Sequence, residues 1–215
     1  MKFKLTLILL LIILTSTTKN LTAQDYAASI KISTLGINAE GIRSFGPELN
    51  ARLGVAFFSY SINDLANSTD FSAAGDLKLL SISALADWFP FENSFRITGG
   101  LMINLNKASM TLTPKKTYSD GNTQYTPEKL GNLTAEIDFN KIAPYLGIGF
   151  GNPTSGASGV GFTFDIGAFY QGGPKANMTA TKLLEPSSSQ GPVLEENLKW
   201  FKFYPVISFG LTYKF

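Results

Sequence analysis

The sequence predicts an all-β chain folded as a transmembrane antiparallel β-barrel, and three observations lead to this fold class. First, residues 205–215 alternate, with Ile207, Phe209, Leu211, Tyr213 and Phe215 apolar and mostly small or polar residues between them. A period of two places these apolar side chains on one face of a strand. Second, Gly, Asn, Pro and Ser cluster between β-rich runs, which is typical of an all-β protein with many turns. Third, the chain begins with a pattern typical of export.

That pattern is a secretory signal at residues 1–23. Lys2 and Lys4 precede an apolar run from Leu5 to Leu14, and a polar Thr/Ser stretch ends near Ala23. The run is about ten residues long, whereas a bilayer-spanning helix needs roughly twenty. We expect residues 1–23 to be a signal peptide and residues 24–215 to form a single barrel domain in the bacterial outer membrane.

Eight β segments are expected, with a polar loop or turn between consecutive ones: Ser29–Phe45, Leu49–Ile62, Asp76–Phe89, Phe95–Thr113, Leu133–Gly151, Gly159–Gln171, Lys175–Leu184 and Pro205–Phe215. In the third segment, alternation predicts that Leu80, Ile82, Ala84, Ala86 and Trp88 face lipid. Leu194, Leu198 and Phe201 fall at helical spacing, which predicts a short helical segment near residues 193–202.

Aromatic residues gather near the expected strand ends, where girdles at the two membrane interfaces would place them: Phe45, Trp88, Phe89, Phe91, Phe139, Tyr145, Phe169, Tyr170, Phe203 and Tyr204.

Two segments change parity, which leaves the strand count open between eight and ten. Ser29–Phe45 does so near Thr34, which predicts a bulge or break, and Leu133–Gly151 does so between Asn140 and Pro144. With eight strands, the long loop Pro114–Asn132 falls on the periplasmic side, where loops are normally short. If the chain instead reverses direction in both segments, ten strands result. We predict eight, with ten as the alternative.

Composition excludes several function classes. The chain contains 18 basic and 16 acidic residues and no basic stripe, so we expect no nucleic-acid partner. It contains no Cys, which excludes disulfides and thiolate metal sites, and no His, the usual general base and nitrogen ligand. No Ser elbow, phosphate-binding loop or paired-carboxylate motif occurs. We therefore expect no enzyme activity, no catalytic residues, no bound metal and no cofactor.

Charged residues inside the expected strands form the candidate site. Asp87 and Arg96 flank the turn at residues 90–94 and are expected opposite one another in the lumen. The complete predicted lumen charge network is Glu40, Arg43, Arg52, Asp87, Arg96 and Asp165. One interpretation is a plug of paired charges, because eight strands leave an interior barely wide enough for side chains. The other is a charge filter that selects solutes.

The chain resembles a group of small Gram-negative outer-membrane proteins. The resemblance is carried by residues 143–151, 164–167 and 170–175, and by the motifs at 87–91, 95–96 and 203–206. These proteins are similar to the OmpA/OmpW-type small barrels and, more loosely, to the ornithine-uptake porin family CarO. The end of the signal also resembles Bacteroidetes secretion signals.

The resemblance implies outer-membrane lipid as the surroundings and the barrel-assembly machinery as a partner during biogenesis. Phe209, Leu211, Tyr213 and Phe215 are the expected assembly signal. We expect a monomer with a structural or surface-interaction role. The alternatives are a narrow channel for small polar or amino-acid-like solutes, and a soluble periplasmic barrel that binds a ligand in an apolar interior.

Overall fold

The computed structural model describes residues 26–63, 69–121 and 123–215. The expected signal peptide, residues 1–23, lies outside the described residues and stays a prediction. The strands are β1 (Tyr26–Ser33), β2 (Gly36–Ser44), β3 (Leu49–Ile62), β4 (Phe71–Trp88), β5 (Phe95–Asn104), β6 (Lys107–Pro114), β7 (Tyr118–Asp120), β8 (Thr123–Tyr125), β9 (Leu133–Asp138), β10 (Ile142–Phe150), β11 (Gly159–Tyr170), β12 (Lys175–Ala180) and β13 (Phe203–Lys214). The helices are α2 (Pro127–Leu130), the 3₁₀ helix η2 (Lys182–Gln190) and α3 (Gly191–Leu198). No helix in this part of the chain is long and apolar enough to cross a membrane.

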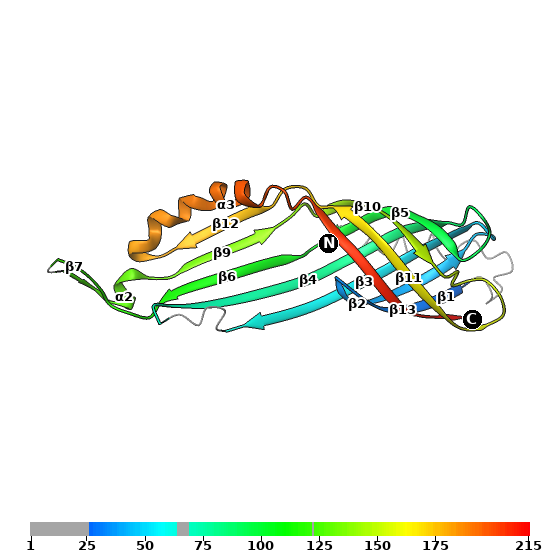
Figure 1. The fold of residues 1–215 in the computed structure, drawn as a ribbon, viewed down its shortest axis with the longest axis horizontal. Helices are drawn as coiled ribbons and strands as arrows, with labels where there is room; N and C mark the ends of the chain where they lie inside the picture. Colours follow the sequence, from blue (N-terminus) through cyan, green and yellow to red (C-terminus); the bar gives the residue numbers. More distant parts are fainter. Residues whose placement is uncertain (1–25, 64–68, 122) are drawn as a thin grey trace, which may run out of the picture.

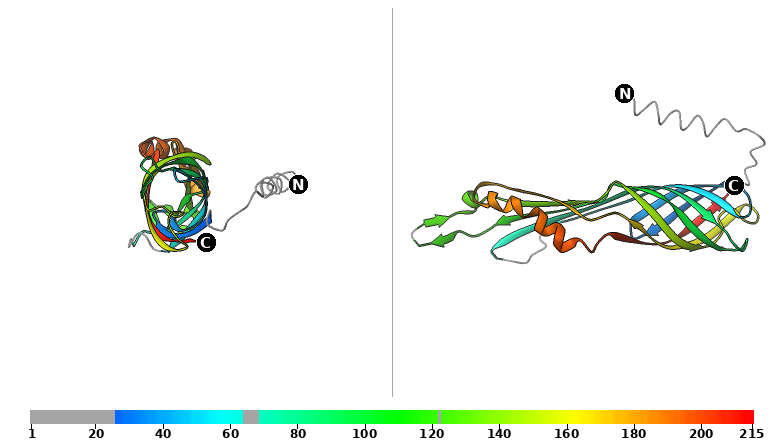
Figure 2. Two further views of the ribbon diagram at one scale, coloured as in Figure 1. Left: turned by 90° about the vertical axis from the view of Figure 1, so that its right-hand side faces the viewer. Right: turned by 90° about the horizontal axis from the view of Figure 1, so that it is seen from above.

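Eight strands close into a barrel, as predicted. The ring runs β1-β2-β3-β4-β5-β10-β11-β13 and closes through the antiparallel pair of β13 and β1 (Figures 1 and 2). β3 and β4 continue beyond the ring and pair onward with β6, β9 and β12. These five strands form a curved sheet that extends from one end of the barrel, which we call the sheet extension (Figure 1). The fold is therefore a closed eight-stranded barrel that continues at one end as an open, curved sheet.

Two predicted segments were wrong as barrel crossings, and the two errors cancel in the count. Ser29–Phe45 is a hairpin of β1 and β2, in which Ser33 pairs with Gly36 across a tight turn. Gly36 has φ +97°, and a Cβ there would lie 2.3 Å from the carbonyl oxygen of Phe57, so the turn requires glycine. Lys175–Leu184 is not a separate crossing, because β12 runs in the same direction as β11 and continues it into the sheet extension.

These corrections place the long loop at the correct end. The chain segment between β6 and β9, which contains β7, β8 and α2, lies at the tip of the sheet extension. The C-terminus and the turns that follow β2, β4 and β10 lie at the opposite end of the barrel (Figure 1), whereas the two-residue turn between β1 and β2 lies on the extension side. In outer-membrane barrels short turns face the periplasm and long loops face outward. We call the two ends the short-turn end and the extension end.

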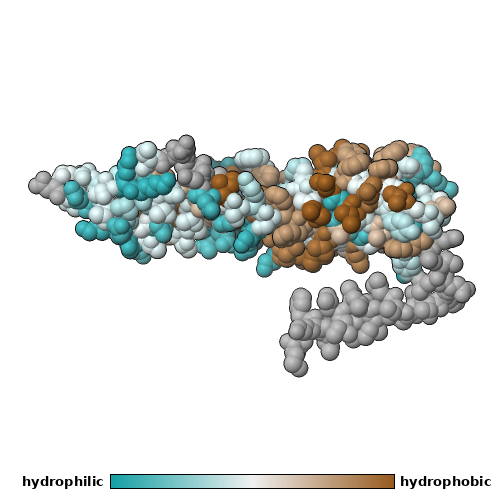
Figure 3. Space-filling model, turned by 90° about the horizontal axis from the view of Figure 1, so that it is seen from below, coloured by the Kyte–Doolittle hydropathy of each residue, from teal (hydrophilic) through white to brown (hydrophobic). Residues whose placement is uncertain are grey.

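The barrel is apolar outside and polar inside. On β13, Phe209, Leu211 and Tyr213 point outward with 49–57% of their surface exposed, whereas Ser208 and Thr212 are buried in the lumen. The five β4 residues expected to face lipid also point outward. Brown apolar atoms cover the barrel half of the molecule in Figure 3. A soluble barrel with an apolar interior is therefore excluded.

Four aromatics of the expected girdles point elsewhere. Phe45, Trp88, Phe91, Tyr170 and Phe203 are exposed on the outside near strand ends. Phe89, Tyr145 and Phe169 are buried instead, and the partly buried Tyr204 stacks on Phe169 inside the barrel. Tyr145 and Phe169 occupy lumen positions because they alternate with outward residues on their own strands.

The polarity of the two faces inverts in the sheet extension. Directly paired residues share a face, and the rows Tyr60-Leu77-Ala108-Ile137-Ala176 and Ile62-Gly75-Met110-Ala135-Met178 continue the inner face of the barrel. The row Ser61-Asp76-Ser109-Glu136-Asn177 belongs to the outer face. The outside of the extension is therefore hydrophilic, as a segment in water requires, and teal to white atoms predominate there in Figure 3.

α3 covers part of the apolar inner face of the extension, where the sequence predicted a helical segment. Val193 and Leu194 of α3 line a hollow of about 290 Å³ together with Met110, Ala135 and Met178. The Glu195 carboxylate accepts a hydrogen bond from the backbone N–H of Ala176 at 2.9 Å, which satisfies a donor on edge strand β12. On the outer face, the hydrogen bond from Lys107 to Glu136 raises the pKa of the Lys107 ammonium group.

Candidate functional site: a charged plug in the barrel lumen

Six charged side chains meet inside the barrel, and we call them the lumen charge cluster: Lys31, Glu40, Arg52, Asp87, Arg96 and Asp165. Each has at most 7% of its surface exposed. They come from six strands: β1, β2, β3, β4 and β5 supply the first five side chains, and β11 supplies Asp165. Three cations therefore face three anions, and the cluster is electrically balanced.

Asp165 lies at the centre of the cluster. Its carboxylate contacts Lys31 Nζ at 2.8 Å, Arg96 Nη2 at 2.5 Å and Arg52 Nη2 at 3.4 Å. Ser208 donates a further hydrogen bond to it at 3.1 Å. An ionised carboxylate is stable in a buried site only when it is paired and hydrogen-bonded. For Asp165, the three cations of the cluster provide the pairing and Ser208 provides a further hydrogen bond.

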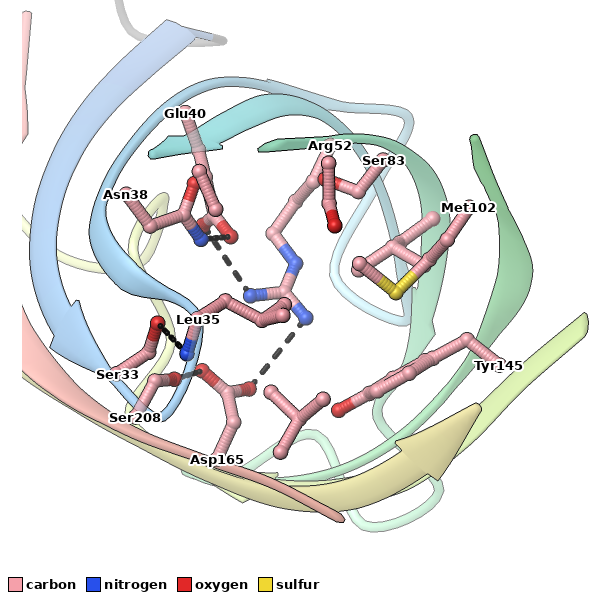
Figure 4. Close-up of a pocket in the computed structure, with 14 residues that line it drawn as sticks. Ser33, Leu35, Asn38, Glu40, Arg52, Ser83, Met102, Tyr145, Asp165 and Ser208 are labelled. Atoms are coloured by element: carbon pink, nitrogen blue, oxygen red, sulfur yellow. Dashed lines mark hydrogen bonds and ion pairs between the residues drawn. The ribbon is translucent and has the colours of Figure 1, made fainter. Parts of the chain in front are cut away.

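The other two carboxylates of the cluster, those of Glu40 and Asp87, both contact Arg52. Glu40 contacts Lys31 Nζ at 2.8 Å and Arg52 Nη1 at 3.3 Å. Asp87 lies 2.9 Å from Arg52 Nε and 3.6 Å from Arg96 Nε. Thr98, which is directly opposite Asp87 on β5, donates a hydrogen bond to it at 2.6 Å. Arg52 therefore bridges three carboxylates, as Figure 4 shows for Glu40 and Asp165.

Glycines provide the space that the long side chains need. A Cβ at Gly149 would lie 2.7 Å from Arg96 Nε and 2.7 Å from the Asp165 carboxylate. A Cβ at Gly54 would lie 2.8 Å from both Glu40 and Ser83. These lumen-facing positions need glycine because a larger residue would displace the ion pairs.

An apolar layer and an amide layer close the lumen toward the extension end. The apolar layer contains Leu35, Ala56, Leu85, Met102, Ala143, Tyr145, Phe169 and Val206. Beyond it, Asn106 accepts a hydrogen bond from Ser81, and Gln171 donates one to the carbonyl oxygen of Phe201. Between the charge cluster and the apolar layer lies a cavity of about 30 Å³ (Figure 4). That volume holds about one or two water molecules.

The structure brings five of the six residues predicted for the lumen network together and leaves one outside. Glu40, Arg52, Asp87, Arg96 and Asp165 join the cluster. Arg43 points outward, with its guanidinium 4.9 Å from the ring centre of Phe45 and 5.7 Å from that of Tyr26. It differs in parity from Glu40 on the same strand, so both cannot face the lumen.

Sequence reasoning missed Lys31. A usable signal was present, because Ser29, Lys31 and Ser33 alternate with Ile30 and Ile32. Once the isoleucines are assigned to lipid, the intervening lysine must point into the lumen. Among the described residues, no group of three or more acidic side chains is placed to hold a metal ion.

The fold and the plugged lumen define a class: the chain is a small closed β-barrel of the transmembrane antiparallel type. No protein-family model matches the chain, and no curated protein matches it. Solved structures that share its fold include CarO and CarO2 from Acinetobacter baumannii. The alignment with CarO has a TM-score of 0.58 at 18% sequence identity, and it covers 88% of this chain and 97% of the CarO chain. CarO2 gives 0.58 at 16% identity, with 88% and 98% coverage.

At this level of identity the likeness establishes a shared fold. The predicted similarity to CarO is thus confirmed as a similarity of architecture. The similarity to OmpA/OmpW-type barrels and the Bacteroidetes origin stay predictions.

Proposed function

We propose that this chain is a non-enzymatic, monomeric outer-membrane barrel with a structural or surface-interaction role. The observation that carries the proposal is the balanced charge cluster, which fills the lumen and leaves a cavity of about 30 Å³. A barrel plugged in this way anchors what lies outside it and does not conduct. The part available for interactions is the sheet extension, with its hydrophilic outer face and the apolar hollow beneath α3.

The outer-membrane location rests on the apolar belt and on the ends of the barrel. Lipid covers the outward side chains, and the sheet extension lies in water because its outer face is polar. It projects into the external medium because it carries the long segment between β6 and β9. Phe209, Leu211 and Tyr213 of β13 and the residue that follows the strand, Phe215, all lie on the lipid-facing side, exposed by 49–57%. That placement makes them accessible to the barrel-assembly machinery, which we propose as the partner during biogenesis.

Replacing Asp87 with Ala tests whether the cluster acts as a structural plug. The substitution leaves Arg52 and Arg96 with one carboxylate fewer in a buried site, so it should destabilise the folded barrel by about 3 kcal/mol or more. The measurement is the thermal unfolding midpoint in detergent, which is read from the mobility shift of the heated barrel on a gel. Unchanged stability together with altered ion selectivity would contradict the plug and favour the filter.

The second candidate function is a narrow channel for small polar or amino-acid-like solutes. The observation that favours it is the small cavity beside Glu40, Arg52 and Asp165, which presents both signs of charge. A zwitterionic solute complements such a lining. This function requires the ion pairs around Arg52 to separate during passage, so it predicts a current that the solute blocks.

A further inference from the structure

Arg43, the residue that the lumen network leaves out, lies beside a lipid-facing groove at the short-turn end. The groove has a volume of about 680 Å³ and lies over β1, β2 and β3. Its lining includes Tyr26, Gly41, Arg43, Phe45, Leu53 and Phe215. Most of these side chains are apolar, and a guanidinium is the only cation among them.

The groove exists because small residues occupy the outward positions of three neighbouring strands. Ala28 pairs with Gly41, which pairs with Leu53, so these three share the outer face in one row. The next row toward the short-turn end is Tyr26, Arg43 and Ala51. Ala28, Gly41 and Ala51 are too small to fill the surface between the larger residues around them.

The guanidinium of Arg43 is held in place and available for an anion. It lies over the rings of Phe45 and Tyr26, and such cation–π contacts fix its position. Within the described residues, no carboxylate forms an ion pair with it. Arginine binds phosphate well because its planar fork of donors matches the phosphate oxygens.

A second hollow continues the apolar path along the barrel wall. It has a volume of about 520 Å³ and lies over β1 and β13. Ala28 lines both hollows, and Ile30, Ile32, Phe209 and Leu211 line the second one. If the phosphate of a lipid lies at Arg43, the acyl chain of that lipid can therefore lie on a continuous apolar surface toward the middle of the membrane.

We propose that Arg43 and this groove form a binding site for one glycerophospholipid of the periplasmic leaflet. The phosphate binds the Arg43 guanidinium at the height of the Phe45 and Tyr26 rings. One acyl chain lies over Gly41 and Ala28. The leaflet follows from the position of the site, which lies with the C-terminus and the turns after β2, β4 and β10 at the end of the barrel opposite the long segment between β6 and β9.

Two variants separate the phosphate contact from the groove. Arg43→Gln removes the cation and leaves the groove intact. Gly41→Leu fills the groove and leaves the cation intact, and the barrel tolerates it because a Cβ at Gly41 meets nothing within 4 Å. Lys202→Gln is the matched control, since it removes an exposed cation at the other end of the barrel wall.

Native mass spectrometry of the full chain in detergent measures the binding of phosphatidylglycerol and of a diacylglycerol with the same acyl chains. We expect Arg43→Gln to weaken phosphatidylglycerol binding about five-fold, the effect of one basic residue at a membrane surface, and to leave diacylglycerol binding unchanged. Gly41→Leu should weaken the binding of both lipids, and Lys202→Gln should weaken neither. The mobility shift on heating verifies that each variant is folded.

Equal phosphatidylglycerol binding by the wild type and Arg43→Gln would overturn the proposal. So would tighter binding of lipid A than of phosphatidylglycerol at this site, because the occupant would then belong to the outer leaflet. Neither result depends on whether the lumen conducts.

Discussion

Asp165→Asn should destabilise the barrel by about 3–5 kcal/mol, the usual effect of removing one partner of a buried ion pair. Asparagine keeps the size of the side chain but cannot neutralise Lys31, Arg52 and Arg96, which all contact this carboxylate. The cluster would then hold three cations and two anions in a lumen almost closed to water. Urea unfolding in lipid vesicles, followed by tryptophan fluorescence, measures the change.

A second substitution tests whether charge balance is the cause. Adding Lys31→Met to Asp165→Asn restores equal numbers of cations and anions, so it should recover part of the lost stability. Asp76→Asn is the matched control, because Asp76 is an exposed carboxylate on the outer face of the sheet extension. A surface substitution away from buried pairs changes stability by about 0.5 kcal/mol or less. If Asp165→Asn and Asp76→Asn unfold alike, the cluster does not stabilise the barrel.

Gly149→Leu should destabilise the barrel by about 3 kcal/mol or prevent its folding. The new side chain would occupy the space that the Arg96 guanidinium and the Asp165 carboxylate fill, each 2.7 Å from the Cβ position. Heat-modified gel mobility after refolding from urea into detergent reports the folded fraction and its thermal midpoint.

Gly41→Leu provides the comparison for this prediction. Gly41 also lies in a barrel strand, but its side-chain position is open and points outward. A surface change of this kind alters stability by about 0.5 kcal/mol or less. Equal losses in the two glycine variants would mean that glycine is needed for strand flexibility and not for the space around Arg96.

Alternation predicted the barrel correctly wherever one face met lipid along the whole strand. Pro205–Phe215 and the part of Asp76–Phe89 from Leu80 to Trp88 are of this kind, and their outward residues are those expected. The signal is strong because the lipid-facing side tolerates few polar residues. A one-residue shift in register would turn all the polar lumen residues of the strand toward lipid. The lumen positions Arg52, Asp87, Arg96 and Asp165 follow from the same alternation.

The first hairpin was missed because its turn does not have the usual turn composition. Thr34 and Leu35 form the turn, and Leu35 is buried in the lumen with 3% of its surface exposed. An apolar turn residue has the same pattern as a strand residue, so the parity change near Thr34 predicts a bulge or break, and a hairpin follows only in the ten-strand alternative. With Ser29–Phe45 as one segment, alternation does not assign Lys31 to the lumen, and it predicts Arg43 in the lumen beside Glu40.

The parity change at residues 140–144 has a different physical cause. The chain does not reverse there, since β9 and β10 run in the same direction. Leu133, Ala135 and Ile137 face the inner side of the extension, whereas Ile142 faces lipid. The apolar side changes because the strand leaves the membrane and its outer face then meets water. Sequence alone cannot distinguish this inversion from a chain reversal.

Single-channel recording in planar bilayers tests the central claim most directly, because a lumen filled by paired charges should not carry ions. The full chain, refolded and inserted, is expected to show no steady openings in salt solution, with or without small zwitterionic solutes. Steady openings that an amino acid blocks would contradict the plug and establish a conducting path past Arg52 and Asp165.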